Sequence, residues 1–249
     1  MRVRIFDTAD QAAAHVHDTI IEQLTCNPGS VLGFPTGGSP LKVYAQLIET
    51  HRAGGPSWKD VTVFNLDEYA GLAWEDPTSY ASYMRTALFD HVDCSPGRRH
   101  IPNGTAPDIK AEAVRYEKSI EAAGGIDLLF LGLGRNGHIA FNEPGATHDS
   151  RTRVVELAED TIAANARFFF SGAQHVPREA ITMGIGTIFD ARRLILLATG
   201  IEKSEAVKLM LEGGTSVNVP ATSLKQHKCI EIILDREAAT ELRGEWNPI

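Results

Sequence analysis

The sequence predicts a three-layer α/β fold, in which a mostly parallel sheet has helices on both faces. Two observations carry this prediction: short β-branched runs alternate with helical segments, and no internal repeat or low-complexity tract interrupts them. The 249 residues, 43% hydrophobic and 22% charged, are also typical of a globular protein with a substantial core. We therefore expect one domain over residues 1–249, with a modified Rossmann-like sheet and a helical lid insertion.

The expected elements follow one another regularly along the chain. Asp7 or Thr8 can cap a first helix that runs to Gln23 and ends at an Asn-Pro-Gly turn. Further helices are expected over Pro40–His51, Ser79–His91 and Ala111–Ala122, and after each of the last two strands. Strands are expected at Val3–Phe6, Val31–Phe34, Val61–Leu66, Ile126–Leu133, Arg192–Ala198 and Cys229–Leu234.

Residues 150–180 break this alternation, because they are polar, have a helical pattern and contain three consecutive phenylalanines. An excursion of this kind from a parallel sheet is often a lid over an active site. The alternative interpretation is an extra pair of packed helices.

Composition excludes several classes of protein. Apolar stretches such as Asp127–Gly134 are too short to cross a bilayer, and no leader of the secretory type opens the chain, so we expect a cytoplasmic protein. Cys26, Cys94 and Cys229 are far apart, which argues against a disulfide framework or a cysteine-zinc site. The histidines form no H-x-x-x-H or H-E-x-x-H pattern, so no metal is expected.

The net charge of −8 argues against a nucleic-acid partner, since no basic run could neutralise a phosphate backbone. A small anionic substrate stays possible, because it needs only a few local cations and backbone N–H groups.

A glycine-rich turn follows the strand Val31–Phe34. Its residues Thr36, Gly37, Gly38 and Ser39 precede Pro40, which suits the first position of a helix. Glycines allow close backbone approach, and the new helix adds free N–H groups and the positive end of its dipole. This pattern favours a phosphate site, although it is not the Walker pattern. The alternative is a plain turn in which Ser39 caps the helix.

Asp67 and Glu68 follow the next strand, at the sheet edge where open α/β sheets bind ligands. A carboxylate there can act as a general base. A helix cap or a solvated turn is the alternative for such an acidic pair.

The segment Gly132–Gly137 matches the G-x-G-x-x-G pattern of dinucleotide sites. Pro144 follows too soon for the long helix that such sites need, and no second strand ending in an acidic residue follows, so this interpretation is disfavoured. The tight loop instead presents Asn136, His138 and Glu143. A histidine beside a carboxylate can exchange protons near neutral pH, whereas a lone loop histidine is more often structural.

Two cations could complete an anion site. Arg167 lies in the expected lid, and Lys203 begins the helix after Leu194–Gly200. Taken singly, each also fits a solvated surface charge.

With these segments aligned, the chain resembles the glucosamine-6-phosphate deaminase family over nearly its whole length. The matching stretches are LGFPTGGSP, FNLDEY, LGLGRNGHIAFNEPG, SRTRVV, NARFF and ATGIEKSEA. The more distant 6-phosphogluconolactonases share the fold and a G-x-G-x-D-G-H loop, but they do not resemble FNLDEY or AFNEP.

The resemblance implies conversion of glucosamine 6-phosphate and water to fructose 6-phosphate and ammonia, without a metal or a cofactor. By resemblance, Asp67 takes the C2 proton of the open-chain sugar, and His138 opens the ring with Glu143 as its carboxylate partner. Asn136 aligns with a position that is Asp in some members, and because Asn cannot relay a proton, His138 is expected to depend more on Glu143. The implied phosphate-binding residues are Thr36, Gly37, Gly38, Ser39, Arg167 and Lys203.

Members activated by N-acetylglucosamine 6-phosphate use a second phosphate site between subunits. Here Arg153 is kept, whereas Ala146 and Val155 stand where a hydroxyl residue and a lysine are expected, and the chain ends soon after Trp246. We therefore expect little or no activation, and either a monomer or a homo-oligomer. A lactonase-type hydrolase and a non-catalytic sugar-phosphate sensor are the alternative functions; the sensor would leave Asp67 without a task.

Overall fold

The structure is a computed structural model that describes residues 1–166, 169, 175–244 and 246. Arg167, an expected phosphate ligand, therefore lies outside the described residues, as do two of the three consecutive phenylalanines. None of the helices in the described ranges is both long enough and apolar enough to span a membrane.

The described residues form a central seven-stranded sheet in which every neighbouring pair is parallel. Its spatial order is β1-β10-β9-β6-β2-β3-β5. The strands are β1 (Arg2–Phe6), β2 (Val31–Phe34), β3 (Thr62–Asn65), β5 (Arg99–His100), β6 (Leu128–Gly132), β9 (Arg193–Ala198) and β10 (Ile230–Asp235). The six strands expected from the sequence are all present, and β5 is an additional edge strand.

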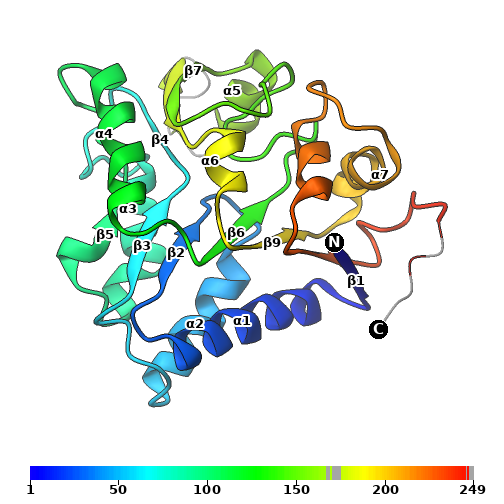
Figure 1. Cartoon of the computed structure of the whole chain (residues 1–249), viewed down its shortest axis with the longest axis horizontal. Helices are drawn as coiled ribbons and strands as arrows, with labels where there is room; N and C mark the ends of the chain where they lie inside the picture. Colours follow the sequence, from blue (N-terminus) through cyan, green and yellow to red (C-terminus); the bar gives the residue numbers. More distant parts are fainter. Residues whose placement is uncertain (167–168, 170–174, 245, 247–249) are drawn as a thin grey trace.

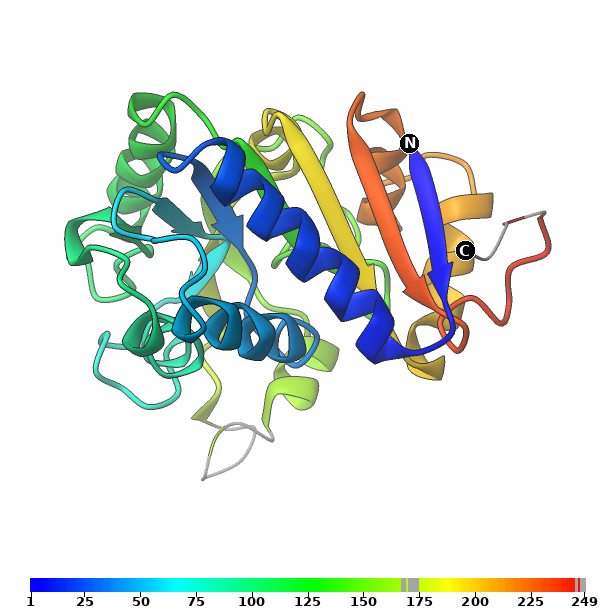
Figure 2. The same ribbon diagram turned by 90° about the horizontal axis from the view of Figure 1, so that it is seen from below.

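Helices cover both faces of this sheet, as Figure 1 shows. The α-helices are α1 (Ala9–Cys26), α2 (Leu41–Arg52), α3 (Tyr80–Ala87), α4 (Ile109–Ala122), α5 (Glu159–Asn165), α6 (Ile185–Phe189) and α7 (Ser204–Glu212). Helices α1 and α2 lie on one face, and α4, α6 and α7 lie on the other. Seen from below in Figure 2, α1 crosses the sheet beside the neighbouring strands β9, β10 and β1. The three-layer α/β prediction is confirmed.

Helix α1 illustrates how the sequence forms these layers. The Thr8 hydroxyl accepts a hydrogen bond from the Gln11 N–H at 3.2 Å, as expected for an N-cap. Val16, Ile20 and Leu24 recur at helical spacing and are buried against the sheet. The helix continues to Cys26, three residues beyond the predicted end at Gln23, before the Asn-Pro-Gly turn stops it.

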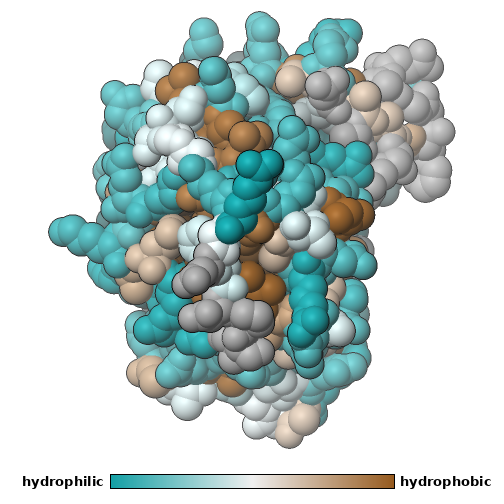
Figure 3. Space-filling model, turned by 90° about the vertical axis from the view of Figure 1, so that its right-hand side faces the viewer, coloured by the Kyte–Doolittle hydropathy of each residue, from teal (hydrophilic) through white to brown (hydrophobic). Residues whose placement is uncertain are grey.

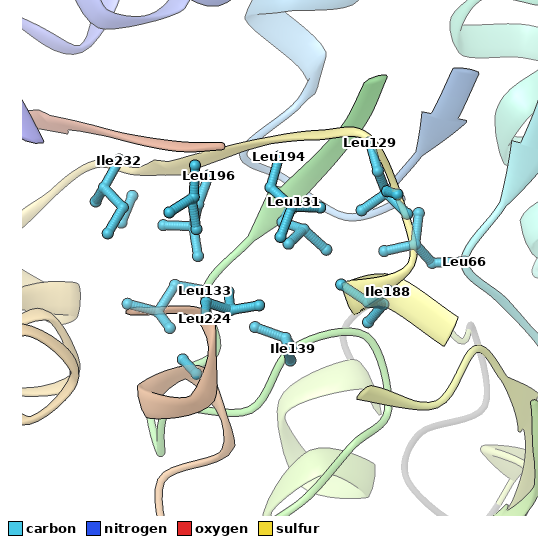
Figure 4. Packing of buried hydrophobic residues seen from close by; sticks show 14 of the residues in the cluster. Leu66, Leu129, Leu131, Leu133, Ile139, Ile188, Leu194, Leu196, Leu224 and Ile232 are labelled. Atoms are coloured by element: carbon cyan, nitrogen blue, oxygen red, sulfur yellow. The ribbon is translucent and has the colours of Figure 1, made fainter. Parts of the chain in front are cut away.

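Two hydrophobic clusters hold the layers together, one on each face of the sheet. Figure 4 shows the cluster on the face of the sheet that α6 covers, where Leu131, Leu194 and Leu196 of the sheet face Leu133 and Leu224. The strands β2, β6 and β9 are buried along almost their whole length, as expected for a sheet covered on both faces. Figure 3 shows a mainly hydrophilic surface on the α7 side, with apolar residues between the polar ones.

The expectation of a helical segment over residues 150–180 is only partly correct. Its ends form strands β7 (Arg153–Glu156) and β8 (Glu179–Thr182), which pair with each other in a separate antiparallel sheet completed by β4 (Asp67–Tyr69). Only α5 is helical among the described residues of the segment, apart from short single-turn pieces. The β-branched pairs Val154-Val155 and Ile181-Thr182 favour this strand pairing, because such side chains pack well on a pleated surface.

The helix expected after the last strand is absent from the described residues, since 236–241 form turns. The Asp235 carboxylate accepts hydrogen bonds from the N–H groups of Gly200 at 3.0 Å and Ala238 at 2.8 Å. These bonds tie the chain into a tight turn against the β9 loop, and this local arrangement replaces a helix.

Candidate active site

Loops from four strands surround a cavity of about 500 Å³ at the carboxyl edge of the central sheet. They follow β2, β3, β6 and β9, and they contribute Thr36–Ser39, Asp67, Gly132–Asn136, His138 and Lys203 to its wall. The cavity lies where β2 and β6 are neighbours but their following strands lie on opposite sides, which is the switch point of the sheet. Helix α5 closes one side with Thr161.

The glycine-rich turn after β2 forms the first wall of the cavity. Gly37 has φ of 100°, a conformation that favours glycine, and its carbonyl accepts a hydrogen bond from the Tyr83 hydroxyl at 2.6 Å. Pro40 is the N-cap of α2, which has no side-chain cap, so Ser39 does not cap this helix. Ser39, two residues before α2, instead lines a common cavity with Lys203.

Asp67 is the first residue of β4, whose backbone pairs with Thr182 of β8. Its side chain lines the cavity, although only 5% of the residue is exposed. Burial and, to a smaller extent, the neighbouring Glu68 raise the pKa of Asp67 to about 8. A carboxyl group with this pKa becomes a stronger base when it ionises, which suits proton abstraction near neutral pH.

Glu68 points away from the cavity and has a different role. Its carboxylate accepts three backbone hydrogen bonds, from Tyr69 at 2.8 Å, Tyr80 at 2.9 Å and Ala81 at 2.8 Å. Tyr80 and Ala81 open α3, so the carboxylate joins β4 to the N-terminus of this helix. Burial raises the pKa of Glu68 to about 7 even though these bonds oppose the rise.

The loop after β6 turns sharply and brings His138 back over Gly134. A Cβ atom on Gly134 would lie 2.3 Å from the His138 ring, so only glycine leaves room for the imidazole there. Gly137 has φ of 80°, and Ala140 is also in the left-handed region with φ of 51°. No helix follows among residues 138–152, which agrees with the rejection of a dinucleotide site.

Asn136 connects His138 with Glu143. The Asn136 Nδ2 donates to Glu143 Oε2 at 2.9 Å, and the Asn136 Oδ1 lies 2.7 Å from His138 Nδ1. A carboxylate only accepts, so the amide orientation is fixed and His138 Nδ1 must donate. The Nε2 atom of the neutral imidazole then carries the lone pair.

Glu143, expected as the carboxylate partner of His138, is connected to it through Asn136. His138 Nδ1 and Glu143 Oε2 are 3.6 Å apart, beyond a hydrogen bond, and the amide of Asn136 bridges them. Burial lowers the pKa of His138, with Glu143 opposing this and Lys203 reinforcing it. The imidazole is thus neutral near pH 7 and can accept a proton.

The sequence analysis missed several cavity residues, and three of them have polar side chains that make or could make hydrogen bonds in the site. Tyr80, Thr161 and Asn165 all line the cavity. Asn165 Nδ2 donates to the Tyr69 hydroxyl at 2.9 Å, and Thr161 donates to Glu143. The only available signal for the last two was their spacing of four residues, which places them on one face of a helix.

The structure brings together the remaining expected site residues from distant parts of the chain. Thr36–Ser39, Asp67, Asn136, His138 and Lys203 line one cavity, and Glu143 lies directly behind Asn136. Among the described residues, no cluster of three or more His, Cys, Asp or Glu side chains could hold a metal ion.

Comparisons with known proteins agree over nearly the whole chain. The family model described as glucosamine-6-phosphate isomerases/6-phosphogluconolactonase matches residues 6–233. The chain is 50% identical over 242 residues to glucosamine-6-phosphate deaminase of Rhodopirellula baltica, covering 97% of this chain and 96% of that protein. It is 46% identical over 241 residues to glucosamine-6-phosphate deaminase 1 of Bacillus subtilis, covering 96% and 98%.

Solved structures give the same result. A monomeric glucosamine-6-phosphate deaminase with 44% sequence identity superposes with a TM-score of 0.94, covering 96% of this chain and 99% of that one. A 6-phosphogluconolactonase from Thermotoga maritima, only 20% identical, shares the fold with a TM-score of 0.74, covering 94% and 100%. The chain therefore belongs to the glucosamine-6-phosphate isomerase/6-phosphogluconolactonase family, and within it to the glucosamine-6-phosphate deaminases.

Proposed function

We propose that this protein converts glucosamine 6-phosphate and water to fructose 6-phosphate and ammonia. The observation that carries the proposal is that Asp67, His138 and Lys203 line one cavity. The cavity volume, about 500 Å³, lies within the range of roughly 300–1,000 Å³ that is common for small-molecule sites.

The phosphate of the substrate binds at the Thr36–Ser39 turn. The N-terminus of α2, the hydroxyl groups of Thr36 and Ser39, and the Lys203 ammonium supply donors and positive charge there. Arg167 is proposed as a further phosphate ligand by resemblance alone. Binding at this end of the cavity directs the sugar carbons toward Asp67 and His138.

Ring opening comes first and uses His138. The Nε2 lone pair, left free by the hydrogen bond between Nδ1 and Asn136, accepts the proton of the O1 hydroxyl. The C1–O5 bond then breaks as the C1 carbonyl forms, and the imidazolium donates that proton to O5, which returns His138 to its neutral form. Glu143 stabilises the transient imidazolium through the Asn136 bridge.

Asp67 then moves a proton between two carbons. Its ionised carboxylate takes the proton from C2 while O1 receives one from the ammonium group of the substrate, and the C1–C2 enolamine forms. Asp67 returns its proton to C1, which leaves an iminium group at C2. Addition of water at C2 and loss of ammonia give the ketone of fructose 6-phosphate.

An ammonia-release assay with glucosamine 6-phosphate, galactosamine 6-phosphate and no substrate tests the proposal. We expect release with a hexosamine 6-phosphate, and no comparable turnover of 6-phosphogluconolactone. Asp67→Asn should lower kcat by roughly 100-fold or more while substrate binding, measured by calorimetry, persists. Asp10→Asn is the matched control, since that carboxylate is exposed and pairs with Lys42 on the surface. Lactone hydrolysis without ammonia release contradicts the proposal.

A further inference from the structure

Thr161 makes an unusual contact for a residue of a short helix. It lies in the first half of α5, is 6% exposed, and its hydroxyl donates a hydrogen bond to Glu143 Oε1. The other oxygen of the same carboxylate, Oε2, accepts the bond from Asn136. The two oxygens of Glu143 are thus held by donors from different segments of the chain.

We propose that Thr161 is a positioning residue for ring opening, acting on His138 through Glu143 and Asn136. This inference rests on the proposed function and deepens it. The Thr161 hydroxyl, which lies outside the loop of residues 137–144, begins a chain of hydrogen bonds. The chain continues through Glu143 and Asn136 and reaches His138 Nδ1.

The geometry explains why a donor is needed at this end. A carboxylate on a flexible side chain can rotate about its last bond, and one neutral donor at Oε2 does not prevent this. With Thr161 at Oε1 and Asn136 at Oε2, the carboxylate plane is fixed, and this fixes which end of the Asn136 amide faces His138. The amide orientation in turn keeps the proton on Nδ1 and the lone pair on Nε2.

Helix α5 is itself anchored at a second point. One turn after Thr161, Asn165 Nδ2 donates to the Tyr69 hydroxyl at 2.9 Å, and Tyr69 is buried in the sheet that contains Asp67. Ile162 of the same helix is buried in the cluster around Tyr69 and Phe141. The Thr161 hydroxyl is therefore held in place by packing that is independent of Glu143.

The test compares Thr161→Val with Thr161→Ser. Valine keeps the shape of threonine and removes only the hydroxyl, whereas serine keeps the donor. Thr19→Val is the matched control, because Thr19 is also a buried helix threonine whose hydroxyl donates, at 2.9 Å, to the His15 carbonyl outside the cavity. The measurements are kcat and KM for ammonia release, and the ¹⁵N shifts of the His138 ring in the protein without substrate.

We expect Thr161→Val to lower kcat about tenfold with KM changed by less than about twofold. The same variant should lose the single Nδ1–H tautomer of His138, and serine should restore both properties. An unchanged tautomer overturns the inference, even if kcat falls, because Thr161 would then act by touching substrate. A changed tautomer with normal kcat overturns its role in ring opening. If the wild-type protein releases no ammonia, the proposed function fails, and the tautomer comparison still decides whether Thr161 positions His138.

Discussion

Burial decides what the Asp67 carboxyl group can do. An exposed aspartate is ionised at neutral pH but is a weak base, whereas Asp67 has a pKa of about 8 because water is largely excluded and Glu68 lies next to it. The sequence placed Asp67 at the carboxyl edge of the sheet but could not supply this burial. The start of β4 is instead placed by its pairing with β8, where Asp67 lies opposite Thr182, a contact between segments more than 100 residues apart.

The pH dependence of turnover follows from this pKa. Only the ionised Asp67 can accept the C2 proton, so kcat/KM should rise with pH and level off above about 8, the pKa of the free enzyme. A pH profile of kcat/KM in buffers of constant ionic strength measures this. An acid limb near pH 4 instead, the ordinary range for an aspartate, would contradict the assignment of Asp67 as the base.

The amide of Asn136 determines how Glu143 is connected to His138. A carboxylate at this position could accept directly from His138 but could not donate to Glu143. The amide does both, with Oδ1 toward the imidazole and Nδ2 toward the carboxylate. The sequence predicted that Asn136, His138 and Glu143 lie together. That Asn136 stands between the other two depends on atomic contacts, which the spacing of residues along the chain does not reveal.

At the scale of elements, the loop after β6 depends on the missing side chain of Gly134. We predict that Gly134→Ala lowers kcat by roughly 100-fold, because the new methyl group would displace the imidazole of His138 from its hydrogen bond with Asn136. Gly97→Ala is the control, since a Cβ atom there meets no neighbour within 4 Å and φ is not positive. Kinetics and thermal unfolding of both variants separate displacement from loss of stability; a normal kcat in Gly134→Ala would show that the ring position is not critical.

The sequence predicted the elements that are long and periodic, and missed the ones defined by tertiary contacts. The buried strand β9 and the amphipathic helix α1 carry clear patterns of their own. Strand β4 has three residues, two of them acidic, so its strand conformation depends on pairing with β8. The prediction of a helix after β10 was wrong because of another tertiary contact: the Asp235 carboxylate accepts a hydrogen bond from the N–H of Gly200, which is distant in the sequence.

For the whole molecule, the charge distribution matters more than the net charge of −8. The cavity is lined by Lys203 and by the Thr36–Ser39 turn that precedes α2, together with Asp67. At the rim, Arg135 and Glu202 lie 3.6 Å apart and partly neutralise each other. An anionic substrate is therefore attracted locally, and its reacting carbons are kept near Asp67 and His138.

Regulation by a second sugar phosphate is also a property of the whole molecule, because it needs a binding site apart from the active site. Arg153, which the family resemblance associates with an activator site, is half-buried, and its guanidinium donates to Asn142 Oδ1 at 2.9 Å. Ala146 and Val155 offer neither a hydroxyl group nor a charge to a phosphate. An activator must bind the active state more tightly than the inactive one, and these side chains provide little basis for such a difference.

We predict hyperbolic kinetics with glucosamine 6-phosphate, and an apparent KM that changes by less than about twofold when N-acetylglucosamine 6-phosphate is added. Initial-rate curves with and without that compound decide the matter: a sigmoidal curve that it converts to a hyperbola would mean that Arg153 and its neighbours form an activator site after all.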